Sequence, residues 1–252
     1  MTDFARISKP EVIAEAGSNH DGSLARALRL IDVAQAAGAS SVKFQFIFPD
    51  GLYLPYFREG NNLYPNPAHR QRAAEQLTTQ QWKEVWRYGE QVGISLSASV
   101  FCERGLNLLA DLGADYVKIA STDLTNHDLI AQAASRFDRV LVSTGMATLA
   151  EVSQTVAMVQ DRHPDVQLEL LHCVSAYPCP VEHANPARVR LLRDAFGVRV
   201  GYSDHTEGNV SAMLALCQGA DLFEKHFTDD RSRAGFDHAN ALEPSQLRNY
   251  VN

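Results

Sequence analysis

The chain has 252 residues, of which 45% are hydrophobic and 21% charged, and its formal net charge is −7. This length suits one large domain whose core needs neither disulfides nor a structural metal. The negative charge argues against nucleic acid or an anionic membrane as a partner. The four cysteines form neither a CxxC pair nor a zinc-type pattern, which predicts reduced thiols.

No apolar run approaches the roughly 18 residues that a membrane-spanning helix needs. Residues 1–10 lack the apolar core of a signal peptide. From these two features we expect a cytoplasmic protein.

Eight short apolar segments recur along the chain, and nearly every one leads into side chains that can do chemistry. They are residues 12–20, 41–46, 94–100, 116–121, 139–145, 168–173, 198–205 and 222–228. Helical patterns stand between them, at 24–37, 79–92, 103–112, 126–137, 149–162, 186–196 and 208–218, with a short last helix from Glu243-Pro244. This alternation indicates a parallel sheet covered by helices. Eight repeats favour a closed (β/α)8 TIM barrel as one domain over 1–252, with an open doubly wound sheet as the alternative.

One connection breaks this rhythm. Residues 47–78 are rich in Pro, Asn, Gly and Tyr and carry no clear periodicity. Long connections in compact domains are usually functional or disordered, and the aromatic content disfavours disorder. We therefore expect a long loop at 47–78 that forms a lid or wall over the strand ends.

Two histidines end neighbouring predicted strands, His205 in GYSDHT and His226 in EKHFT. Parallel strands bring such ends together, and neutral imidazole is the commonest protein ligand for metals. Two histidines with open positions suit a divalent metal that keeps water or substrate oxygen as further ligands. The alternative is that each is simply a hydrogen-bonded residue at a strand end.

Lysines and hydroxyls accompany them on other strands. Lys43 and Lys118 lie in VKFQ and VKIAS, where a buried lysine must be paired, so they predict an anion site, a Schiff base or a salt bridge to Glu15 or Glu224. Hydroxyl groups that could complete an oxyanion cradle belong to Ser99, Ser121, Ser143, Thr144 and Ser203.

Carboxylates and amides supply the remaining polar groups. Glu15 and Asp123 are candidates for acid–base work or for binding sugar hydroxyls, with pairing to the lysines as the alternative. A polar pocket for a hydroxylated substrate is predicted from Asn19, His20, Gln45, Tyr177, Asp237 and His238.

The strings IAEAGSNHDGS, VKFQ, VKIAS, STGMATLAEV, LHCVSAYP, GYSDHT and EKHFT, in this order, resemble the sialic acid synthase family over almost the whole chain. The resemblance implies a barrel that condenses phosphoenolpyruvate with the open-chain aldehyde of an N-acetylhexosamine and releases phosphate. It implies Mn²⁺ or Mg²⁺ on His205 and His226, and a homodimer. It places phosphoenolpyruvate against Lys43, Ser99, Lys118, Ser121, Ser143, Ser175 and Ser203.

The resemblance also assigns the acceptor side. The sugar is expected near Gln45, Asn61, Tyr177 and Asp237, with Glu15 beside the reacting centre. Asp123 stands where the family usually has a longer Glu, Phe46 replaces a small residue, and SASVFCE replaces STPFDE. The C-terminal antifreeze-like domain usual in the family is not expected in this chain. Two other functions remain open, a Schiff-base aldolase or lyase acting through Lys118, and a ligand-binding paralogue with impaired catalysis.

Overall fold

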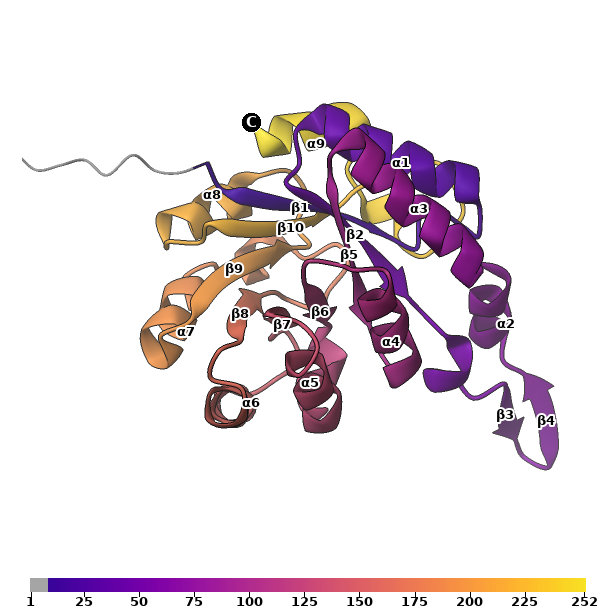
Figure 1. The fold of residues 1–252 in the computed structure, drawn as a ribbon, viewed down its shortest axis with the longest axis horizontal. Helices are drawn as coiled ribbons and strands as arrows, with labels where there is room; N and C mark the ends of the chain where they lie inside the picture. The colour runs from indigo at the N-terminus through magenta and orange to yellow at the C-terminus, as the bar shows by residue number, and fades with distance from the viewer. Residues whose placement is uncertain (1–8) are drawn as a thin grey trace, which may run out of the picture.

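Eight parallel strands close into a barrel in the computed structural model, which describes residues 9–252 (Figure 1). Around the barrel they are β1 (Glu11–Gly17), β2 (Ser41–Phe46), β5 (Ser95–Val100), β6 (Val117–Ile119), β7 (Arg139–Ser143), β8 (Gln167–His172), β9 (Arg199–Asp204) and β10 (Leu222–His226), which pairs with β1. The predicted TIM barrel is confirmed. The expectation about a signal peptide rests mainly on residues 1–8, which lie outside the described range.

Helices follow the strands and cover the outside of the barrel (Figure 1). They are α1 (Leu24–Ala37), α3 (Thr79–Val92), α4 (Glu103–Asp111), α5 (His127–Ala134), α6 (Leu149–Arg162), α7 (Arg188–Phe196), α8 (Val210–Cys217) and α9 (Pro244–Val251). Thr78 and Thr148 form capping boxes that start α3 and α6, and the predicted bounds of α1, α3 and α6 are confirmed at both ends. The helices α4, α5, α7 and α8 are shorter than predicted, because their outer residues form turns. None of the helices described is both long and apolar enough to cross a membrane.

The lower part of the barrel interior is filled and closed. A separate apolar cluster occupies it, made of Ile13, Tyr116, Leu141, Leu171 and Leu222, each at most 1% exposed. At the N-terminal ends of the strands an ion-pair network joins Arg139 and Arg199 to Glu11 and Glu169. Because this end is closed, the barrel can be open only at the carboxyl ends of its strands. The four cysteines are unpaired thiols in the described chain.

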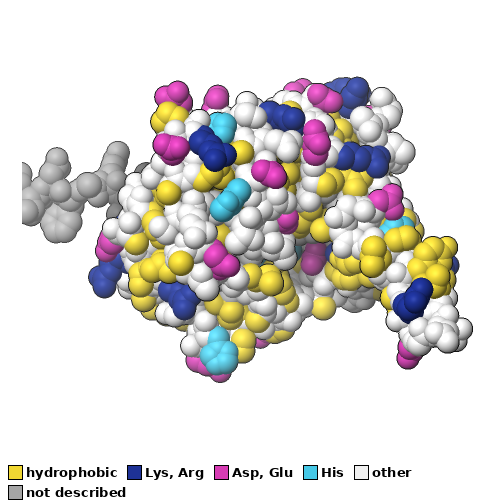
Figure 2. All heavy atoms as spheres, turned by 90° about the horizontal axis from the view of Figure 1, so that it is seen from below, with side chains coloured by type: hydrophobic (Ala, Val, Ile, Leu, Met, Phe, Trp, Pro, Cys, Tyr) yellow, Lys and Arg dark blue, Asp and Glu magenta, His cyan; other side chains and the backbone are white. Residues whose placement is uncertain are grey.

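The segment between β2 and α3 differs from the long loop predicted. It contains a 3-10 turn (Pro49–Gly51), a hairpin of β3 (Tyr56–Glu59) and β4 (Asn62–Pro65), and the helix α2 (Pro67–Ala74). The hairpin projects from the barrel and carries a gathering of hydrophobic side chains (Figures 1 and 2). The Gly-Asn pair at its turn is a hairpin signal that the prediction overlooked. The helix α2 packs beside the barrel mouth, where its end closely approaches Gly22, and the 3-10 turn packs near Cys102, with Pro49 buried.

Candidate active site

A cavity of about 250 Å³ opens at the carboxyl ends of the strands. Every strand of the barrel contributes to it, either directly or through the residues that follow it. Its walls include most of the residues predicted from the sequence, namely Glu15, Lys43, Gln45, Ser99, Lys118, Ser121, Ser143, Ser175, Tyr177, Ser203, His205 and His226. The structure thus brings together groups that are spread over more than 200 residues of chain.

The alternation of strand side chains explains this convergence. Successive residues of a strand point to opposite faces, so every second residue enters the barrel. On β2 these are Lys43 and Gln45, and on β10 they are Glu224 and His226. The register pairs Glu15 of β1 with both Lys43 and His226, which sets a carboxylate, a lysine and an imidazole at one level of the barrel.

Two lysines and two glutamates form the charged centre of the cavity. The Nζ atom of Lys43 lies 2.6 Å from Glu15 and 3.4 Å from Glu224. The Nζ atom of Lys118 lies 3.6 Å from Glu224. All four side chains are at least nine-tenths buried. The lysines therefore make the salt bridges considered from the sequence, and they also line the cavity.

Burial and charge shift the pKa values of these groups in different directions. Burial raises the pKa of Glu15, and the attraction of Lys43 does not cancel this effect. Burial acts in the same sense on Glu224, but Lys118 and Lys43 together hold the pKa of this carboxyl well below its usual range. The pKa of Lys118 is lowered by burial, against the pull of Glu224. One carboxyl is thus suited to exchange a proton and the other to remain charged.

Hydroxyl groups surround the lysines. Ser99 accepts a hydrogen bond of 2.6 Å from Lys43, and Ser203 donates one of 2.7 Å to Glu224. The Oγ atom of Ser143 is buried and has no hydrogen-bond partner among the described residues. Since buried polar atoms are rarely left unpaired, this hydroxyl is available for a ligand. Gly145 must stay small, because a Cβ atom there would lie 2.6 Å from the sulfur of Cys173.

The two histidines lie side by side at the cavity wall, with ring centroids 6.1 Å apart. The Nδ1 atom of His205 is 2.7 Å from the carbonyl oxygen of Val174, which makes Nε2, 3.3 Å from the Ser203 hydroxyl, the acceptor nitrogen when Nδ1 carries the proton. Burial, followed by the neighbouring His226, lowers the pKa of His205 to about 4. The Nδ1 atom of His226 is buried and unpartnered within residues 9–252. A neutral imidazole and an orphaned ring nitrogen fit the chemistry of a metal site.

Protein groups alone do not complete such a site. No set of three or more His, Cys, Asp or Glu side chains in residues 9–252 is arranged to hold a metal. A metal on the two histidines would therefore keep several positions for water or substrate oxygen.

Of the residues predicted to bind the acceptor, some lie at the cavity and others lie outside its lining. Tyr177 stands at the cavity mouth, 54% exposed, with its ring 4.1 Å from that of His205. Asp237 lies close by, beside Gly17 and near Gln45. Asp123 is outside the cavity lining, in a 3-10 turn where it contacts Thr122 and Asn126. The hairpin turn holds Asn61, exposed and likewise outside the lining.

One central residue was undervalued by the sequence analysis. Glu224 was considered only as a salt-bridge partner, yet it contacts both lysines and Ser203 in the middle of the cavity. Its position two residues before His226 on the same strand was the available signal, because residues at that spacing share a face. An apolar part of the lining, formed by Phe101, Met146 and Cys173, was also not predicted from the sequence.

Comparison with known proteins agrees with this geometry. The sequence model of the NeuB family matches residues 30–252. The chain belongs to the NeuB family. It is 34% identical to the N,N'-diacetyllegionaminic acid synthase of Legionella pneumophila, over 95% of this chain and 70% of that protein. It is 32% identical to the synthase of the same description from Campylobacter jejuni, over 96% of this chain and 74% of that protein.

A solved structure shows the same relationship. The crystal structure of the N-acetylneuraminic acid synthetase of Leptospira borgpetersenii, in complex with citrate, superposes with a TM-score of 0.87 at 32% identity. The match covers 97% of this chain and 82% of that one. This NeuB-family chain thus shares its barrel with synthases of sialic-acid-type sugars, and its cavity occupies the position where TIM-barrel enzymes carry their active sites.

Proposed function

We propose that this NeuB-family chain condenses phosphoenolpyruvate with the open-chain aldehyde of an amino sugar, giving a sialic-acid-like 3-deoxy-2-ulosonate and phosphate. The observation that carries the proposal is the pairing of two kinds of site in one cavity. Two buried lysines with serine hydroxyls suit a phosphorylated carboxylic acid, and two adjacent imidazoles suit a metal that binds an aldehyde oxygen.

The lysines and hydroxyls have the role of binding the donor. Phosphoenolpyruvate carries its negative charge on a carboxylate and a phosphate, and the net charge of the protein would repel it. Lys43 and Lys118 provide local positive charge, and the free hydroxyl of Ser143 adds a hydrogen-bond donor. When the donor binds, the lysines can exchange part of their contact with Glu224 for contact with the ligand.

Glu15 has the role of moving a proton. In the overall reaction, C3 of phosphoenolpyruvate bonds to the aldehyde carbon, water adds at C2, and phosphate leaves. The added water must lose a proton, and Glu15, with its raised pKa, lies within the cavity to accept one. The amide of Gln45 donates to Glu15 at 3.0 Å and holds the carboxylate in place.

His205 and His226 would hold a divalent metal, Mn²⁺ or Mg²⁺. When bound, that ion would supply Lewis-acid polarisation of the aldehyde oxygen. Tyr177 stacks on His205 and fixes the plane of its ring, and the Val174 carbonyl fixes its tautomer.

The test is phosphate release by the purified full chain. After treatment with chelator, the protein is given phosphoenolpyruvate with N-acetylmannosamine, N-acetylglucosamine, mannose or arabinose, with and without Mn²⁺ or Mg²⁺. We expect sugar-dependent phosphate release that requires the metal. Absence of release with every acceptor, while phosphoenolpyruvate still binds, would instead support the ligand-binding paralogue.

A separate titration tests the metal site. Calorimetry with Mn²⁺ should show binding that His205→Ala and His226→Ala remove. His183, exposed in the 3-10 turn Val181–His183, offers a matched control in His183→Ala. Stoichiometric Mn²⁺ binding by both active-site variants would contradict the assignment.

A second candidate function has one observation in its favour. A Schiff-base lysine must be neutral to attack a carbonyl, and burial lowers the pKa of Lys118. An aldolase or lyase acting through Lys118 would need no metal, and borohydride would trap its substrate on this lysine. Trapping at Lys118 with metal-independent turnover would favour this candidate.

A further inference from the structure

A buried arginine joins the helix α2 to the mouth of the barrel. Arg72 is 8% exposed, whereas Arg70 on the same helix is exposed. A buried charge is tolerated only where other groups satisfy it, so the contacts of Arg72 are informative. Its NH1 atom lies 2.7 Å from the hydroxyl of Ser18 and 3.3 Å from the carboxylate of Glu75, and its guanidinium lies 3.7 Å from the ring centroid of Phe236.

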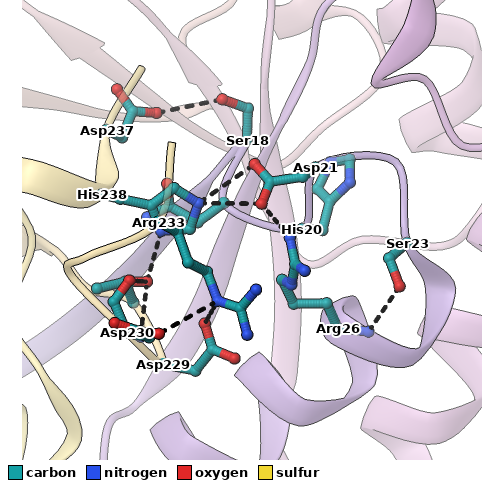
Figure 3. Close-up of polar contacts among 12 residues, drawn as sticks. Ser18, His20, Asp21, Ser23, Arg26, Asp229, Asp230, Arg233, Asp237 and His238 are labelled. Atoms are coloured by element: carbon teal, nitrogen blue, oxygen red, sulfur yellow. Dashed lines mark hydrogen bonds and ion pairs between the residues drawn. The ribbon is translucent and has the colours of Figure 1, made fainter. Parts of the chain in front are cut away.

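Ser18 links Arg72 to Asp237 through two hydrogen bonds. The Ser18 hydroxyl accepts a hydrogen bond from Arg72, so its own hydrogen is free to point elsewhere. It donates to Oδ2 of Asp237 at 3.3 Å (Figure 3). Arg72, Ser18 and Asp237 therefore form one directed chain of donors that ends on a carboxylate.

The end of this chain lies near Gln45 and Glu15 of the cavity wall, while Asp237 itself is not part of the lining. A Cβ atom on Gly17 would be 2.8 Å from Oδ2 of Asp237, 3.6 Å from the Gln45 amide and 3.6 Å from Glu15. The Oδ2 atom that Ser18 contacts and the Oε1 atom of Glu15, the acid assigned to proton transfer, thus both lie next to Gly17. Asp237 also keeps its second oxygen free of any bond to Ser18 or Arg72.

The loop that carries Asp237 is fastened on both sides of this residue. On one side His238 is fully buried and lies 2.7 Å from the Thr228 hydroxyl. It also contacts Asp21 at 3.1 Å (Figure 3). On the other side Phe236 stacks on Arg72. The contacts of His238 involve only the barrel and its own loops, whereas the contact of Phe236 with Arg72 depends on α2.

We propose that Arg72 is a positioning residue for the acceptor, which aims the Asp237 carboxylate through Ser18 and holds its loop through Phe236. The proposal rests on the proposed function, because it takes Asp237 to bind hydroxyl groups of the sugar. It gives α2 a defined task in acceptor recognition, whereas the donor groups Lys43 and Lys118 make no contact with Arg72.

Kinetics of Arg72→Gln, compared with Arg70→Gln, test the proposal with the sugar that gives the fastest phosphate release. Loss of a hydrogen bond to a charged group lowers affinity by about tenfold to hundredfold. We therefore expect the KM of the sugar to rise by the same factor. The KM of phosphoenolpyruvate should stay within about twofold, Arg72→Lys should recover part of the loss, and Arg70→Gln should behave as the parent. An unchanged sugar KM, or an equal rise in both KM values, would overturn the proposal.

A second measurement does not depend on turnover. Amide hydrogen exchange of residues 228–242 in the full chain should accelerate in Arg72→Gln and in Ser18→Ala, but not in Arg70→Gln. The double variant should exchange no faster than Arg72→Gln, because the contact between Arg72 and Ser18 is already lost in that variant. Faster exchange without any turnover would leave the positioning role standing and reject the proposed function. Unchanged exchange in Arg72→Gln would reject the positioning role itself.

Discussion

Glu15 and Glu224 lie on neighbouring strands and both approach the Nζ atom of Lys43, at 2.6 and 3.4 Å, yet their pKa values shift in opposite directions. The second lysine accounts for the difference, because Lys118 contacts Glu224 and not Glu15. Two carboxyls of one type thereby acquire different pKa values from their surroundings, a pattern known from enzymes that separate acid and base.

Replacing Glu15 with Gln should reduce kcat by about 10²- to 10⁴-fold, the usual contribution of a general acid or base. The amide keeps an oxygen for the Gln45 contact, and Lys43 keeps Glu224 and Ser99 as partners after it loses its ion pair with Glu15. In the parent protein, activity should rise with pH through the raised pKa of Glu15, and this rise should be missing from Glu15→Gln. Steady-state phosphate release between pH 5 and 8 measures both, with exposed Glu90→Gln as control. A kcat within twofold of the parent would exclude Glu15 from proton transfer.

Replacing Glu224 with Gln should lower the free energy of unfolding. The change leaves two buried lysines without their shared carboxylate, and breaking a buried ion pair typically costs about 3–5 kcal/mol. Urea unfolding at pH 7 measures this free energy, and Glu182→Gln, at an exposed position, should leave it unchanged. An unfolding free energy equal to that of the parent would show that the lysines find other partners.

Much of this site follows from strand geometry and was therefore predictable. Lys43, Ser99 and His226 could be assigned to one cavity because strand residues alternate and parallel strands end together. Arg72 could not, because its contact with Ser18 joins residues 54 positions apart through the packing of α2. Asn61 was expected near the sugar by resemblance alone, and in this fold it lies in the turn of the β3–β4 hairpin, outside the lining of the cavity.

Lys118→Ala should weaken the binding of phosphoenolpyruvate far more than the binding of the acceptor sugar. The lysine lies among the hydroxyls of the cavity, and a charge-assisted hydrogen bond contributes about 1.5–3 kcal/mol, or about tenfold to hundredfold in affinity. Separate KM values for the two substrates test this, with exposed Lys83→Ala as the matched control. If the donor KM stays the same, or if borohydride and substrate yield an adduct on Lys118, the Schiff-base candidate gains instead.

His20 should make the free energy of unfolding depend on pH. This dependence should extend to pH values above those at which carboxyl groups usually titrate. The ring is 3% exposed between Phe44 and Trp82, and burial, together with Arg26 and Arg72, lowers its pKa to about 4. Between pH 6.5 and 4 the unfolded chain binds a proton at this residue that the folded chain does not. The free energy of unfolding must therefore fall as the pH falls through this window, by about 3 kcal/mol from His20 alone.

Urea unfolding of metal-free protein at pH 7 and at pH 4.5 measures this dependence in the parent and in His20→Asn. Asparagine can still accept the hydrogen bond that the Gly22 amide donates to Nδ1, but it does not titrate. His205, whose pKa is also about 4, contributes equally to both proteins and cancels in the comparison. The loss of stability on acidification should be smaller in His20→Asn than in the parent. Equal losses in the two proteins would mean that His20 takes up its proton without unfolding.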